Sequence, residues 1–115
     1  MSSAIYKIAR VREWEDTIRN GLFTGSADDK RDGFIHFSTA AQVRTTWEKY
    51  FSTEKRFYLV AVDPDCLGPP LKWEPSRGGQ LFPHLYGPLP LALVRSVVEI
   101  LCSPDGRPLF PPEIA

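Results

Sequence analysis

The spacing of apolar residues near the start of the chain predicts a strand followed by a helix. Residues 5–9 have the composition of a β-strand. Beyond them, apolar side chains recur every three or four positions, the spacing of one helix face, at Val11, Trp14, Ile18 and Leu22. Asn20-Gly21 then provides a C-terminal stop for the helix, because glycine readily adopts the left-handed conformation found there.

Polar residues dominate positions 23–33, where glycine, serine and charged side chains follow one another without an apolar period. This composition predicts an exposed loop. The loop leads directly into the first histidine of the chain, His36, and is placed to act as a lid over a site there.

A second strand and helix are predicted in the next segment. Residues 34–37 form a short apolar run of β-formers, and Thr39 followed by Gln42 matches a capping box that opens a helix. We expect this helix to bury a stripe made of Val43, Trp47, Tyr50 and Phe51.

The second half of the chain reads mainly as strands. Residues 57–62 are continuously apolar, which favours a strand covered on both faces at the centre of a sheet. Shorter strand patterns follow at 71–74 and 94–102, and the turn sequence at 103–106 would let Leu109-Phe110 pair back on the last strand. The order of elements predicts an α+β fold with a mixed or antiparallel sheet and two main helices, in one domain over residues 1–115.

Composition narrows the classes of function. Fourteen basic and fourteen acidic residues cancel, so nucleic-acid binding through bulk charge is not expected. The apolar runs are too short to cross a bilayer and no leader pattern is present, so we expect a soluble cytoplasmic protein. Cys66 and Cys102 are expected to be reduced, partly buried thiols, although a disulfide between them stays open.

The only two histidines stand in aromatic surroundings. His36 lies two positions before Ser38 on the predicted strand, so both side chains would project from one face and could grip a diol or a carboxamide. Alternatively, His36 is a core residue bonded to backbone, and Ser38 or Thr39 only caps the following helix.

His84 lies between Pro83 and Leu85-Tyr86-Gly87-Pro88, which predicts a shaped loop. Tyr86 adds an aromatic face with a polar tip. We interpret the two histidine segments as walls of one cleft for a small molecule, the alternative for His84 being a packed loop whose ring nitrogens bond to main chain.

Glu74 and Arg77 precede the second histidine closely. A carboxylate and an arginine beside a dry pocket would serve as general base and anion clamp. The alternative is a surface ion pair of little energetic consequence. The histidines lack the spacing of a metal site, so no metal is predicted.

The segments Gly33-Phe34-Ile35-His36-Phe37-Ser38 and Phe82-Pro83-His84-Leu85-Tyr86-Gly87 resemble the DUF952 family, small bacterial proteins of unknown function. The resemblance spans nearly the whole chain, but Lys7 stands where many members carry a histidine. It implies a fold grouped with the ADP-ribosyltransferases, in which a His-x-Ser pair contacts the riboses of NAD.

By that analogy His36 and Ser38 would hold a ribose, with Thr39 and Arg77 nearby, and Tyr86 or His84 would pack on nicotinamide. Glu74 and Glu99 are both candidates for the catalytic carboxylate, and we place Glu74 and His84 in catalytic roles. The first hypothesis is therefore an NAD-binding, ADP-ribosyltransferase-like enzyme. The alternative is a non-catalytic module that binds a nucleotide, another metabolite or a protein partner.

Overall fold

Nine strands and three α-helices make up residues 3–114, the part of the chain that the computed structural model describes. The helices are α1 (Val11–Asn20), α2 (Ala27–Asp32) and α3 (Val43–Tyr50). The strands are β1 (Ile5–Arg10), β2 (Leu22–Phe23), β3 (Ile35–His36), β4 (Ser38–Thr39), β5 (Arg56–Val62), β6 (Leu71–Pro75), β7 (Leu81–Leu85), β8 (Leu89–Pro90) and β9 (Val94–Leu101). The predicted α+β class is confirmed, and the strands of each sheet pair antiparallel.

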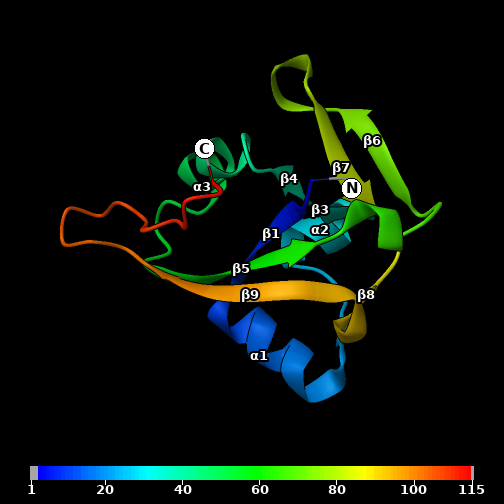
Figure 1. The fold of residues 1–115 in the computed structure, drawn as a ribbon, viewed down its shortest axis with the longest axis horizontal. Helices are drawn as coiled ribbons and strands as arrows, with labels where there is room; N and C mark the ends of the chain where they lie inside the picture. Colours follow the sequence, from blue (N-terminus) through cyan, green and yellow to red (C-terminus); the bar gives the residue numbers. More distant parts are fainter. Residues whose placement is uncertain (1–2, 115) are drawn as a thin grey trace.

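The largest sheet has the order β4-β1-β5-β9. The predicted central strand is confirmed, because β5 pairs with β1 along one side and with β9 along the other. Figure 1 shows these strands side by side, with α1 on one side of them and α3 on the other. Side chains of β5 alternate between two buried clusters, one containing Trp14 of α1 and the other Trp47 of α3. The alternation places one core on each face of the sheet.

A second sheet, of order β3-β7-β6, stands beside the first. The chain passes between the two sheets at Phe37, because β3 ends one residue before it and β4 begins one residue after it. Phe37 is 2% exposed, and its backbone N–H donates to the carbonyl of Pro83, at 3.0 Å between N and O. Consequently His36 belongs to one sheet and Ser38 to the other, although only one residue separates them.

Two segments predicted as loops contain regular structure. The exposed loop predicted at 23–33 contains the end of β2 and all of α2, whose side chain Asp29 is buried. A capping box starts α2, since the Ser26 hydroxyl accepts from the Asp29 N–H and the Asp29 carboxylate accepts from the Ser26 N–H. His84 itself and Leu85 lie in strand β7, which tolerates Pro83 in the middle of a sheet, whereas Tyr86, Gly87 and Pro88 form the predicted loop between β7 and β8.

Details of the two predicted helix stripes are wrong. Ile18 and Tyr50 are 59% and 57% exposed, whereas Trp14 and Trp47 are buried as expected. The Thr39 side chain does not cap α3, which begins at Val43. Only one side-chain contact of the predicted box exists there, in which the Thr39 N–H donates to Oε1 of Gln42.

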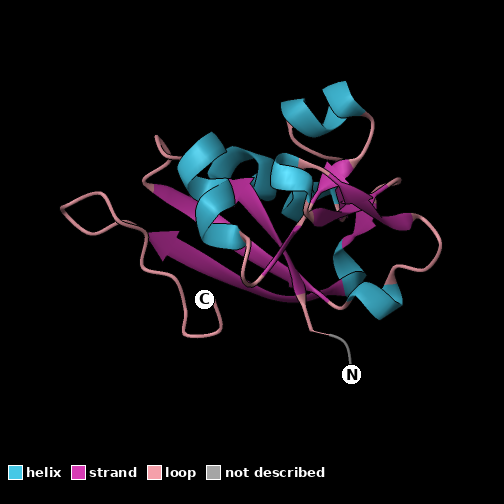
Figure 2. Cartoon of the chain, turned by 90° about the horizontal axis from the view of Figure 1, so that it is seen from above, coloured by secondary structure: helices cyan, strands magenta, loops and turns pink. Residues whose placement is uncertain are grey.

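The C-terminal segment folds back as predicted. Gly106 N–H donates to the carbonyl of Ser103, and Leu109 N–H donates to that of Leu101. Figures 1 and 2 both show this turn projecting from the end of the sheet. Cys66 and Cys102 are free thiols, but Cys66 is exposed rather than partly buried. Among the described residues, no helix is both long and apolar enough to span a membrane.

Candidate functional site

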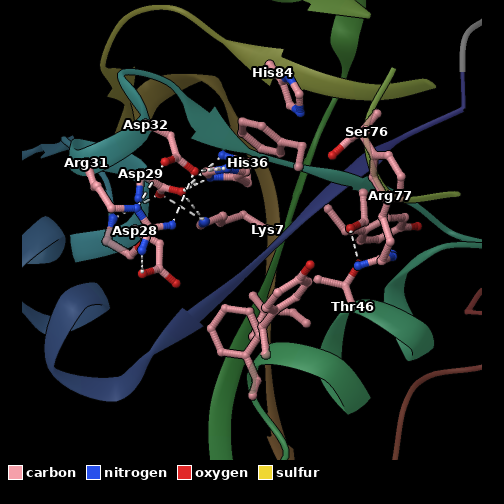
Figure 3. Close-up of a pocket in the computed structure, with 18 residues that line it drawn as sticks. Lys7, Asp28, Asp29, Arg31, Asp32, His36, Thr46, Ser76, Arg77 and His84 are labelled. Atoms are coloured by element: carbon pink, nitrogen blue, oxygen red, sulfur yellow. Dashed lines mark hydrogen bonds and ion pairs between the residues drawn. The ribbon is translucent and has the colours of Figure 1, made fainter. Parts of the chain in front are cut away.

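A cavity of about 210 Å³ lies between the two sheets, beside β1. Strand β4 pairs with β1 only at Ile5 and Tyr6, so the next residues of that edge, Lys7 and Ile8, border the cavity. Helices α2 and α3 and strand β7 supply the other walls (Figure 3). The polar and charged side chains that line it are Lys7, Ser26, Asp28, Asp29, Arg31, Asp32, His36, Ser38, Thr46, Ser76, Arg77 and His84.

The two histidines are brought together as predicted. His36 of β3 and His84 of β7 are direct partners in the antiparallel register, and their ring centroids lie 5.6 Å apart. Phe34 stacks on the His84 ring, with centroids 4.0 Å apart and planes inclined by 27°. Both rings border the cavity, so the cleft inferred from the sequence has the two imidazoles in its wall.

Asp29 anchors the side of the cavity formed by α2. Its side chain is 2% exposed, and its oxygens lie 2.9 Å from Lys7 Nζ and 2.6 Å from His36 Nδ1. Burial alone would raise the pKa of Asp29, but the hydrogen bond from His36 and the Lys7 ammonium together hold that pKa well below its usual range. Asp29 is therefore an ionised carboxylate in the interior.

His36 stands between two carboxylates. While Asp29 accepts from Nδ1, Oδ2 of Asp32 lies 3.0 Å from Nε2. Arg31 also binds Asp32, and mainly through this hydrogen bond the pKa of the Asp32 carboxyl is lowered. A neutral imidazole has a single N–H, so only a protonated ring can donate toward both of these carboxylates.

His84 has a carboxylate partner of its own. Its Nδ1 lies 2.8 Å from Oε1 of Glu74 on the neighbouring strand β6, and the Tyr86 hydroxyl donates to the same oxygen at 2.8 Å. These hydrogen bonds, the one from His84 first, lower the pKa of Glu74, and the carboxylate raises the pKa of Tyr86. Among residues 3–114, His84 Nε2 has no hydrogen-bond partner.

Hydroxyl groups and an arginine form the opposite wall. The Ser38 and Thr46 hydroxyls lie 2.9 Å apart, and Nη2 of Arg77 donates to Oγ1 of Thr46 at 3.1 Å. The guanidinium also lies over the rings of Tyr50 and Phe82, 5.6 Å and 4.7 Å from their centroids. No carboxylate lies within ion-pair distance of Arg77 among the described residues, in contrast to Lys7 and Arg31.

The remaining predicted site residues lie elsewhere. Glu74 and Tyr86 are behind His84 and do not line the cavity, and the predicted pairing of Glu74 with Arg77 is wrong because Glu74 binds His84. Thr39 borders a different, wide hollow beside the start of β1. Glu99, the other candidate carboxylate, pairs with Arg56 across β5 and β9.

Sequence reasoning missed eight polar or charged residues of the cavity: Lys7, Ser26, Asp28, Asp29, Arg31, Asp32, Thr46 and Ser76. A charged residue inside the apolar run at 5–9 was one available signal, since a buried lysine needs a partner. The Ser26-x-x-Asp29 pattern was another, because it marks a helix start within a polar segment. The described residues contain no group of three or more His, Cys, Asp or Glu side chains arranged to hold a metal ion.

Comparison with known proteins places the chain in a family. The family model described as protein of unknown function, DUF952, matches residues 8–97, which carry every cavity-lining residue except Tyr6 and Lys7. The chain belongs to the DUF952 family. No curated protein matches this DUF952 chain.

Solved structures similar to this DUF952 protein include protein CC0527 from Caulobacter crescentus. The chain in its crystal structure has 43% sequence identity to this one and superposes on it with a TM-score of 0.87. The match covers 92% of this chain and 93% of that one. The solution NMR structure of the same protein gives 42% sequence identity and a TM-score of 0.83, and the match covers 94% of this chain and 93% of that one. The likeness covers the whole arrangement of helices and sheets and gives no ligand or reaction.

Proposed function

We propose that this DUF952 protein binds a small anionic metabolite in the cavity, with a nucleotide of the NAD type as the first candidate. Arg77 carries the proposal. It is fixed by Thr46 and by two aromatic rings, yet only one of its N–H groups has a hydrogen-bond partner among residues 3–114. A held guanidinium with unused donors at a cavity wall suits a phosphate or carboxylate group.

Two neighbours of Arg77 suit the sugar of a nucleotide. His36 and Ser38 both border the cavity, in agreement with the ribose role that the family resemblance implies for them. A volume of about 210 Å³ is below the ~300–1,000 Å³ typical of ligand pockets, so it would enclose a ribose and a phosphate rather than a whole dinucleotide. The rest of the ligand would extend past the cavity mouth.

ADP-ribosyl transfer is a second candidate, favoured by the His36-x-Ser38 pair at the cavity wall. That reaction calls for a carboxylate near the sugar to stabilise a cationic transition state. Glu74 is 35% exposed, does not line the cavity and accepts hydrogen bonds from two side chains. Binding is therefore the primary proposal.

The free Cys66 thiol agrees with a cytoplasmic location.

Thermal melting with NAD, ADP-ribose and nicotinamide tests the binding proposal. We expect ADP-ribose and NAD to raise the melting temperature of the wild-type protein, since a ligand that binds only the folded state stabilises it. Arg77→Gln should abolish the rise. Arg107→Ala, which removes an arginine that is 86% exposed in the C-terminal turn, should retain it.

Absence of any melting shift with all three compounds, confirmed by calorimetric titration, would refute NAD-type binding. The transferase candidate has its own readout, the release of nicotinamide from NAD in the presence of acceptor proteins. Release that persists in Glu74→Gln would exclude Glu74 as the catalytic carboxylate.

A further inference from the structure

Each histidine of the cavity forms a hydrogen bond through Nδ1 to a carboxylate from a different element. Asp29 of α2 holds His36, and Glu74 of β6 holds His84. A carboxylate at Nδ1 fixes the orientation of an imidazole and leaves Nε2 to act on a ligand. Because the two histidines are register partners, their side chains lie on one face of the sheet, and both residues border one cavity.

The two rings differ in what their Nε2 atoms meet. His36 Nε2 lies 3.0 Å from a carboxylate oxygen of Asp32, a position from which a protonated ring can donate. His84 donates from Nδ1 to Glu74, and Nε2 has no partner among the described residues. In a neutral ring that atom is a lone-pair acceptor. With His36 protonated and His84 neutral, one cavity can supply both a proton donor and a proton acceptor.

Asp32 lies beside His36 Nε2 but also has a second partner. Its carboxylate also accepts from Arg31 Nε at 3.0 Å, and its side chain is 34% exposed. A substrate oxygen that replaces Asp32 at Nε2 would leave that carboxylate paired with Arg31. Asp29, by contrast, is 2% exposed and keeps His36 in place.

We propose that His84 and His36 are a general base and a general acid that hydrolyse a phosphodiester bond, in a substrate whose phosphate is held by Arg77. His84 Nε2 takes a proton from water while the water oxygen forms a bond to phosphorus. The bond from phosphorus to the leaving oxygen breaks, and that oxygen takes the proton from His36 Nε2. Solvent then returns the displaced protons, so the net reaction consumes one water and yields a phosphate monoester and an alcohol.

A phosphodiester fits these groups better than a neutral ester does. Its charge needs a cation, and Arg77 is the lining cation without a carboxylate partner in the described structure. Its attacking water and its leaving alkoxide need a base and an acid, which the two histidines provide. The inference shares the Arg77 anion site with the proposed function, but adds a reaction that binding alone does not require.

The experiment measures hydrolysis of two phosphodiesters by the purified protein, 2′,3′-cyclic AMP and bis(p-nitrophenyl) phosphate. The key variants are His84→Asn and His36→Asn, since the Asn amide imitates the Nδ1–H donor and lacks Nε2. We expect His84→Asn to lower the rate on both substrates by about 10²–10⁴-fold. His36→Asn should lower it as strongly on the cyclic nucleotide but far less on the nitrophenyl ester, whose leaving group departs without a proton.

A structural role for the histidines would not depend on the leaving group, so this difference separates catalysis from folding. If His84→Asn fails to fold, Glu74→Gln replaces it, with a lower kcat and an unchanged KM expected because Glu74 only positions the base. Arg107→Ala is the matched control and should keep the wild-type rate on both substrates.

Two results would overturn the inference: wild-type hydrolysis no faster than buffer, or a rate that folded His84→Asn and Glu74→Gln both retain. These failures are distinct from a failure of the proposed function. A melting shift with ADP-ribose that needs Arg77, without phosphodiester cleavage, supports binding and refutes catalysis. Cleavage that needs His84, without an NAD or ADP-ribose shift, supports catalysis and refutes NAD-type binding.

Discussion

Lys7 and Asp29 form an ion pair in the protein interior, with Nζ and Oδ2 2.9 Å apart and both side chains at most 4% exposed. The pair joins the middle of β1 to α2, and the same Asp29 carboxylate also forms a hydrogen bond with His36. Lys7 is thus a cationic support for Asp29, which in turn holds His36.

Breaking this pair should destabilise the fold strongly. Lys7→Met leaves Asp29 as a buried charge without its ammonium partner, and such a change costs about 3–5 kcal/mol of unfolding free energy. Urea denaturation measures the loss. The double variant Lys7→Met with Asp29→Asn should recover part of it, because no unpaired charge then remains. Equal stability of the single variant and the wild type would contradict the buried pair.

The acid stability of the protein should depend on Asp29. Its pKa is lower in the folded protein than the ~3.9 of a free aspartate, so its contribution to stability is complete above that value and is lost as the pH falls below it. Melting temperatures between about pH 2 and pH 7 measure this. Asp29→Asn should flatten the acid limb. Asp16→Asn, at an exposed carboxylate of α1, should follow the wild-type curve.

Removing the Tyr86 hydroxyl should change the titration of Glu74. The hydroxyl is one of two donors to Oε1, so Tyr86→Phe should move the pKa of Glu74 upward while the larger effect of His84 remains. Carbon-detected NMR of the glutamate carboxyl groups follows the change. Tyr50→Phe is the matched control, and an unchanged Glu74 titration in Tyr86→Phe would show that the hydroxyl does not act on it.

Gly25 should tolerate a side chain less well than Gly21. Both have positive φ, but a Cβ at Gly25 would lie 2.8 Å from Cβ of Asp29, whereas at Gly21 nothing lies within 4 Å. Gly21→Ala should therefore cost about 1–2 kcal/mol for its left-handed backbone alone. Gly25→Ala should cost about 1–3 kcal/mol more, because Asp29 is fixed by His36 and Lys7. Urea midpoints of the two variants compare these costs, and equal midpoints would refute the close approach.

Strong hydrophobic patterns made the sheet predictable. Residues 57–62 are apolar on both faces and became β5, and residues 94–102 correspond to β9 with its returning turn. The segment 23–33 was not predictable in this way, because the apolar face of α2 is almost absent. Its burial depends on one charged residue, Asp29, whose partner Lys7 is distant in sequence.

The candidate site was predictable only in part. Aromatic surroundings pointed to His36 and His84 as neighbours, and their shared cavity agrees with this. The pairing of Glu74 with His84 instead of Arg77 follows from the β6–β7 register, which sequence spacing does not supply. Likewise, Thr46 reaches Arg77 through the packing of α3 and not through any local motif.

The crossing of the chain at Phe37 has a mechanical consequence. His36 is attached to the three-stranded sheet and Ser38 to the four-stranded sheet, so a molecule that contacts both would cross-link two separately hydrogen-bonded units. Local opening of either sheet would then require the molecule to dissociate first. In amide exchange, protection would rise together in β1 and β7, far beyond the atoms that the molecule touches.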